Sequence, residues 1–210
     1  MMTRISILAL SILLFCVSPV YAATINVFGQ SLGANTITGD EVGGITTITG
    51  LDVPVVITTL NEVGVSTPAL FTFNAVSTAA ATNVSGNLWT QPYDGSFSIL
   101  SGGGFNYLSG DFAGVSLGVD GGSTLILGAT QPPLSLLFTS DVAGMPLGDP
   151  TGMALAFTNA AISINNNSFG DFTSNVAGNF SATPVPEPAS LLLLGSGLLA
   201  LARIRRNKKV

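Results

Sequence analysis

The feature that most constrains this chain is the absence of positive charge from its long central part. All six Lys and Arg residues of the 210-residue sequence lie near the two ends, and His is absent. The central part, from Ala23 to Pro186, carries ten carboxylates, namely Asp40, Glu41, Asp52, Glu62, Asp94, Asp111, Asp120, Asp141, Asp149 and Asp171. This part cannot form an internal salt bridge, and without Lys or Arg to neutralise phosphates it is not expected to bind nucleic acid. Its uniform negative charge is expected to keep copies of the protein apart.

The N-terminal end has the composition of a secretory signal peptide. Arg4 precedes a thirteen-residue apolar run, Ile5–Val17, and Val20-Tyr21-Ala22 places small residues at positions −3 and −1 of a cleavage site. We therefore predict a signal peptide over residues 1–22, cleaved after Ala22. A transmembrane anchor is the less favoured alternative, because thirteen residues are too few to span a hydrocarbon core of ~30 Å. The single Cys, Cys16, lies in this segment, so the mature chain is expected to have neither a disulfide nor a thiolate metal site.

The C-terminal end, residues 184–210, has three parts in a fixed order. A linker rich in proline, Pro184–Pro188, precedes an uncharged apolar run, Ala189–Ala202. A basic cluster follows, made of Arg203, Arg205, Arg206, Lys208 and Lys209. The prolines predict a stiff, extended linker, and the apolar run predicts a single transmembrane helix whose basic end stays in the cytoplasm. The helix is short, since fourteen residues rise only about 21 Å, and an interfacial helix is the alternative.

These three parts resemble the PEP-CTERM sorting signal of Gram-negative bacteria, with Pro186, Glu187 and Pro188 as the sorting motif. The resemblance implies that an exosortase processes the protein and removes the tail at or near this motif. It also implies that the precursor is anchored in the inner membrane by its C-terminal helix, and that the body then reaches the cell surface or the extracellular matrix. The same kind of tail is also known as an ice-binding protein C-terminal domain, a description of the tail that implies no ice binding by the body.

The body, residues 23–183, has the apolar pattern of β-strands. Pro54–Leu60 and Ala69–Val76 are rich in β-branched and aromatic residues, and Ser96–Leu100 and Ala161–Asn165 alternate. Clusters of Gly, Asp and Asn separate the expected strands at spacings near ten residues, and no amphipathic helix of ten or more residues stands out. We expect one all-β domain, an antiparallel β-sandwich, with a jelly roll as one form of it.

A short repeat suggests a different architecture. Thr36-Ile37-Thr38 and Thr47-Ile48-Thr49 lie eleven residues apart, and stacked Thr-x-Thr strands form the flat faces of some ice-binding solenoids. A solenoid needs three or more sustained repeats, so we favour a hairpin as the origin of this spacing.

Candidate functional residues in the body are few. Asp94, Asp111 and Asp120 lie in or near expected loops and are weak candidates for Ca²⁺, although solvated turn aspartates are the favoured interpretation. Trp89 and Tyr93 are the candidates for carbohydrate contact, although aromatic residues more often fill cores. Without His, Lys or Cys in the body, acid–base catalysis would fall to carboxylates or Tyr. We therefore expect no cofactor, no metal and no enzymatic activity.

The sequence thus predicts an exported, non-enzymatic β-protein with a structural or adhesive role in an extracellular polymer layer. Its candidate partners are the exosortase, the membrane before processing and an extracellular polysaccharide. The alternatives are a calcium-dependent carbohydrate-binding module and a polysaccharide-acting enzyme, which would need two carboxylates facing each other in a cleft.

Overall fold

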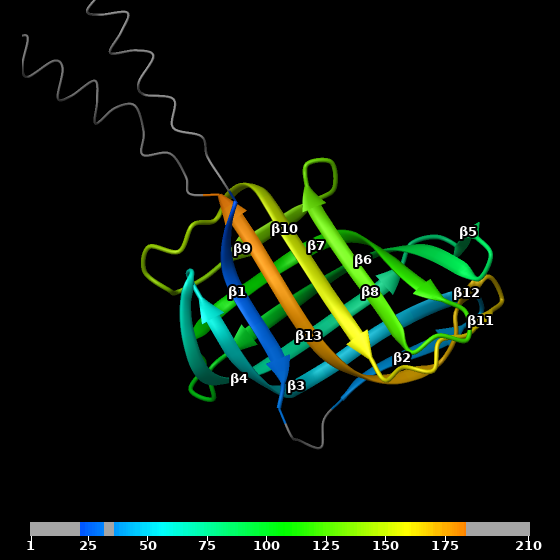
Figure 1. The fold of residues 1–210 in the computed structure, drawn as a ribbon, viewed down its shortest axis with the longest axis horizontal. Coiled ribbons are helices and arrows are strands. Elements are labelled where there is room, and N and C mark those ends of the chain that lie inside the picture. Colours follow the sequence, from blue (N-terminus) through cyan, green and yellow to red (C-terminus); the bar gives the residue numbers. More distant parts are fainter. Residues whose placement is uncertain (1–21, 32–35, 184–210) are drawn as a thin grey trace, which may run out of the picture.

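Antiparallel strands make up most of the described chain, as the alternating apolar pattern predicts (Figure 1). The structure, a computed structural model, describes residues 22–31 and 36–183. Its strands are β1 (Ala23–Gln30), β2 (Ile37–Val42), β3 (Ile45–Leu60), β4 (Val63–Ser77), β5 (Thr82–Ser85), β6 (Leu88–Leu100), β7 (Asn106–Val119), β8 (Thr124–Gln131), β9 (Leu136–Thr139), β10 (Gly148–Thr158), β11 (Ile164–Asn165), β12 (Ser168–Phe169) and β13 (Phe172–Thr183). All strand pairings among these elements are antiparallel. The predicted all-β class is therefore confirmed.

Eight of the strands form a closed barrel. Hydrogen-bonded neighbours follow the order β6-β4-β3-β1-β13-β10-β8-β7, and β7 pairs with β6 to complete the ring. This corrects the predicted sandwich, because a sandwich consists of two packed sheets, whereas here one sheet closes on itself. Both architectures hide one face of every strand, so the alternating sequence pattern is the same for both. The choice between them is made by which strands pair.

Phenylalanine rings fill the inside of the barrel. The ring centroids of Phe28 and Phe71 lie 4.8 Å apart, and those of Phe97 and Phe180 lie 4.7 Å apart. Rings at such distances are in favourable contact. An eight-stranded barrel is just wide enough for its interior to be filled by side chains, so room for a functional site is expected in the wall or at the ends.

Three positions in the wall are each occupied by two strands placed end to end. β1 and β2 both pair with β3 and β13. In the same way β4 and β5 pair with β6, and β8 and β9 pair with β7. The reason is length: β3 has 16 residues, whereas β1 has 8 and β2 has 6. β1 ends at Gln30 and β2 begins at Ile37, and the candidate site described below lies at this junction.

The threonine repeat belongs to the hairpin formed by β2 and β3. Thr38 and Thr49 are direct partners in this pairing, and their hydroxyl oxygens lie 3.2 Å apart. On the other side of β2, Thr38 is paired with Thr173 of β13. The spacing of eleven residues is therefore that of a hairpin, which confirms the favoured explanation of the repeat.

The two ends of the barrel sequence lie side by side, because Ala23 in β1 is paired with Ala182 in β13 (Figure 1). β1 begins at the first residue after the predicted signal-peptide cleavage, and β13 ends at Thr183. Most of the predicted signal peptide and the whole predicted C-terminal helix lie outside the described residues. Within residues 22–31 and 36–183, no helix is long and apolar enough to cross a membrane.

Candidate functional site

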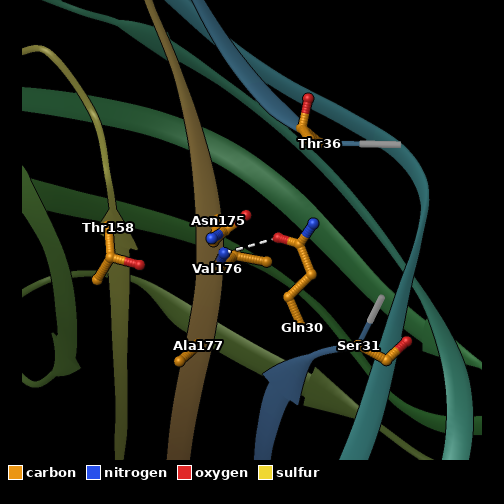
Figure 2. A pocket seen from close by; sticks show the side chains of 7 residues that line it. All are labelled: Gln30, Ser31, Thr36, Thr158, Asn175, Val176 and Ala177. Atoms are coloured by element: carbon orange, nitrogen blue, oxygen red, sulfur yellow. Dashed lines mark hydrogen bonds between the residues drawn. The ribbon is translucent and has the colours of Figure 1, made fainter. Parts of the chain in front are cut away.

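A pocket with a volume of about 590 Å³ opens where β1 ends and β2 begins. Its lining residues, drawn in Figure 2, are Gln30, Ser31, Thr36, Thr158, Asn175, Val176 and Ala177. They come from the end of β1, from β10 and β13, and from Ser31 and Thr36, two described residues that lie between β1 and β2. The volume falls within the range of about 300–1,000 Å³ that is usual for small-molecule sites.

The side chain of Gln30 contacts β13 between the described parts of β1 and β2. β13 pairs with β1 at Ala177 and with β2 at Ser174, and among the described residues no strand pairs with the backbone between these two positions on that side. The backbone N–H of Val176 instead donates a hydrogen bond to Oε1 of Gln30 at 2.9 Å (Figure 2). Because buried backbone groups need a partner, the side-chain amide of Gln30 satisfies this N–H at the edge of the pocket.

One pocket-lining residue, Ser31, is tied to β3. The backbone N–H of Ser31 donates to the carbonyl of Pro54 at 2.9 Å, which connects the end of β1 to β3. The register between β3 and β4 shifts between Gly50 and Val53. A bulge of this kind bends a strand locally, so β3 is irregular close to its contact with Ser31.

The chemistry of the lining is polar and uncharged. Ser31, Thr36 and Thr158 carry hydroxyl groups, and Asn175 carries an amide. Within the described residues, none of these four side chains hydrogen-bonds to another protein group. The part of the lining that the structure describes includes no ionisable and no aromatic residue. The described lining can therefore donate and accept hydrogen bonds.

The two aromatic residues predicted to contact carbohydrate, both in β6, differ in their exposure to solvent. Tyr93 has no solvent exposure, and its hydroxyl donates a hydrogen bond to Oε1 of Gln91 at 3.0 Å. Burial raises the pKa of Tyr93 well above its usual range. A fully buried ring cannot stack on a ligand at the surface, so the prediction for Tyr93 is wrong. Trp89 is half-buried and packs against the core, and its role stays a prediction.

An exposed aromatic residue at the turn between β6 and β7 is not among the predicted site residues. Phe105 is 44% exposed, and its ring meets that of Tyr107 edge-on, with centroids 5.3 Å apart. The run Gly102-Gly103-Gly104 directly before Phe105 indicates a turn. An aromatic residue that follows such a run is a candidate for surface exposure, and this signal was present in the sequence.

The three aspartates considered for Ca²⁺ do not form one cluster, although Asp94 and Asp111 are diagonal neighbours on adjacent strands. Asp94 and Asp111 lie on the outer faces of β6 and β7, where their partners across the sheet are Ala113 and Ser96. Asp120 follows β7, and its Oδ1 accepts a hydrogen bond from the backbone N–H of Ile164 at 3.2 Å. Among the described residues, no three His, Cys, Asp or Glu side chains form a group that could hold a metal ion.

Many carboxylates of the body hold turns and strand ends. Oδ2 of Asp141 accepts from the backbone N–H of Asn106 at 3.0 Å, and Oδ1 of Asp171 accepts from that of Glu41 at 2.7 Å. Six of the ten accept such hydrogen bonds from backbone or side-chain groups, namely Glu41, Asp52, Asp120, Asp141, Asp149 and Asp171. These six groups have structural partners. Of the three Ca²⁺ candidates, Asp120 lies in a turn, whereas Asp94 and Asp111 lie within β6 and β7, so the turn interpretation is wrong for those two.

The predicted processing residues flank the barrel. Ala22 is exposed directly before β1. The residues Pro186, Glu187 and Pro188 and the basic cluster Arg203, Arg205, Arg206, Lys208 and Lys209 lie outside the described residues.

Comparison with known families identifies one of these flanking segments. The family model of the PEP-CTERM protein-sorting motif matches residues 184–206. The match contains the Pro-Glu-Pro sequence, the apolar run and Arg203, Arg205 and Arg206, and it ends before Lys208. No curated protein and no solved structure matches the chain. The motif implies export and surface sorting, with an exosortase as the processing partner.

Proposed function

We propose, from the premise that the chain carries a PEP-CTERM protein-sorting motif, that the barrel is the cargo of this signal. In this proposal the barrel works at the cell surface or in the extracellular matrix as a non-enzymatic structural or adhesive module. One observation carries it: the motif begins at residue 184, directly after β13 ends at Thr183. Cleavage at or near the Pro-Glu-Pro sequence would therefore release the barrel without cutting any of its strands.

The arrangement of the ends supports delivery of an intact barrel. Because Ala23 pairs with Ala182, the predicted signal peptide and the sorting tail are attached at the same end of the barrel. A precursor anchored by its tail would hold the barrel by that end. β13 is 12 residues long, and its start lies about 37 Å from its end along an extended strand, so the far end would be directed away from the anchor.

The side-chain chemistry supports a non-enzymatic role. The pocket between β1 and β2 is lined by uncharged residues, and six of the ten carboxylates hold local structure by accepting hydrogen bonds. Glycoside hydrolysis needs two carboxylates placed across a substrate. An uncharged pocket is better suited to holding a ligand than to converting it.

The test is the intact mass and the location of the protein recovered from its native host. We expect a mass that lacks residues 1–22 and the residues beyond the Pro-Glu-Pro sequence, in the surface or matrix fraction of the culture. A matched strain with Pro186, Glu187 and Pro188 all changed to Ala should accumulate uncleaved protein in the membrane fraction.

Two results would contradict the proposal. A mass that retains Arg203 to Val210 in the wild-type strain would show that the tail is a lasting anchor. Release of reducing sugar ends from purified matrix polysaccharide by the recovered protein, at a rate above that of a heat-inactivated sample, would favour the polysaccharide-acting enzyme.

A further inference from the structure

We infer that the pocket between β1 and β2 binds an uncharged, hydroxyl-rich ligand, of which a unit of a neutral polysaccharide is the clearest example. The inference rests on the proposed function, because it names the kind of polymer that the exported barrel would hold. Four properties of the pocket support it: its hydrogen-bonding groups, its lack of charge, its size and its position.

The hydrogen-bonding groups of the pocket are available to a ligand. Ser31, Thr36, Thr158 and Asn175 have no side-chain hydrogen bond to another group within the described residues. Thr158 and Asn175 are direct partners across β10 and β13, so a hydroxyl and an amide lie next to each other at the edge of the pocket (Figure 2). Hydroxyl and amide groups both donate and accept hydrogen bonds, and they match the hydroxyl groups of a sugar.

Charge restricts the ligand to a neutral one. No described residue of the lining is ionisable, and the central part of the chain has ten carboxylates and no cation. A polymer of uronic acids or a phosphorylated ligand would approach a uniformly negative body and would find no Lys or Arg in the pocket. A neutral sugar is not repelled by the negative charge of the body, and it needs no cation in the pocket.

The pocket also suits one or two sugar units in size and position. Its volume of about 590 Å³ lies in the usual range for small-molecule sites. It lies at the end of β1 opposite to Ala23, seven residues or about 23 Å along the strand. A polymer chain could therefore reach it while the barrel is still held by its tail.

Binding of immobilised glycans by the processed protein from the native host tests the inference. The panel contains neutral glucan, mannan and galactan oligosaccharides, together with the anionic polymers alginate and polygalacturonate. We expect binding to at least one neutral glycan and to neither anionic polymer. The double variant Thr158→Val with Asn175→Leu removes two hydrogen-bonding groups and should bind that glycan about tenfold more weakly.

Two further variants show whether the effect belongs to the pocket. Thr130→Val changes an exposed hydroxyl on β8, outside the pocket lining, and should bind as the wild type does. Phe105→Ala removes the exposed aromatic ring and should also leave binding unchanged. Melting temperatures of all variants are measured alongside, and the single variants Thr158→Val and Asn175→Leu replace the double variant if it unfolds.

The inference is overturned if no neutral glycan binds, if the pocket variants bind like the wild type, or if Phe105→Ala alone abolishes binding. These outcomes can be told apart from failure of the proposed function. If wild-type protein is absent from the surface and matrix fractions, the proposed function fails whatever the pocket binds. If it is present there and the pocket variants bind normally, only the assignment of the pocket fails.

Discussion

At the scale of single residues, two buried side-chain amides differ in their hydrogen bonding: one is fully paired and the other is unpaired. Gln91 and Asn26 both have no solvent exposure. Nε2 of Gln91 donates to Oγ of Ser168 at 2.7 Å and to the carbonyl of Ala79 at 3.1 Å, and its Oε1 accepts from Tyr93 and from the N–H of Phe169. Neither amide atom of Asn26 has a hydrogen-bond partner in the described part of the protein. A buried polar group is costly unless it is paired, so the same substitution is expected to have opposite effects at the two positions.

We predict that Gln91→Leu lowers the free energy of unfolding by about 3 kcal/mol, because it leaves several buried groups unpaired. Asn26→Leu should raise the free energy of unfolding by about 1 kcal/mol, because it removes an unpaired buried amide. Urea unfolding of the two variants and the wild type measures both changes. A loss of stability in Asn26→Leu equal to that in Gln91→Leu would contradict this interpretation of the two sites.

At the scale of the strands, β4 and β6 approach each other closely opposite Gly95. Gly95 is paired with Ala75, and a Cβ at this position would contact the carbonyl oxygen of Asn74 and lie 2.8 Å from Cα of Ala75. These are backbone atoms, which cannot move aside as the end of a flexible side chain can. A methyl group added at Gly64, near the start of β4, would instead have no described atom within 4 Å. The two glycines therefore form a matched pair in neighbouring strands.

We predict that Gly95→Ala lowers the free energy of unfolding by about 3 kcal/mol, since it forces β4 and β6 apart. Gly64→Ala should change it by less than about 1 kcal/mol, because the added methyl group meets open space. Thermal unfolding followed by circular dichroism compares the two variants. Equal melting temperatures for both would show that the close approach of the two strands is not required.

At the scale of the whole molecule, the charged side chains of the central part of the chain are all negative. The central part of the chain has ten carboxylates and no Lys, Arg or His, so its charges repel one another without compensation. Repulsion of this kind destabilises a compact state, and salt screens it.

We predict that the processed protein becomes more stable as salt is added. Raising NaCl from about 10 mM, where the Debye length is ~30 Å, to about 1 M, where it is ~3 Å, should raise Tm by about 2–4 °C. CaCl₂ at the same ionic strength should give no larger increase, because the described residues hold no group of three metal ligands. A Tm that is independent of NaCl would refute the repulsion argument, and a markedly larger effect of CaCl₂ would favour the calcium-dependent module.

The sequence alone was sufficient for the features that depend on short, linear segments. The order of linker, apolar run and basic cluster predicted the sorting signal that the family comparison finds at residues 184–206. Alternating apolar residues predicted most of the strands, and the Thr-x-Thr spacing was correctly attributed to a hairpin. The strand predicted over Ala161–Asn165 was wrong for its first three residues, because only Ile164–Asn165 form a strand, β11. Such features can be predicted from the sequence because a processing enzyme recognises a continuous segment, and because strand and turn preferences act over a few neighbouring residues.

The tertiary structure decided which strands pair, and with that the closure of the barrel and the position of the pocket. Gln30, Thr158 and Asn175 are far apart in the sequence and meet only because β1 and β10 both pair with β13. The burial of Tyr93 also depends on the tertiary structure. An alternating pattern does not show which face of β6 lies inside the barrel, and the closure of the sheet decides this. Pairings over such distances depend on the combined packing of all strands, and no local stretch of this sequence encodes them by itself.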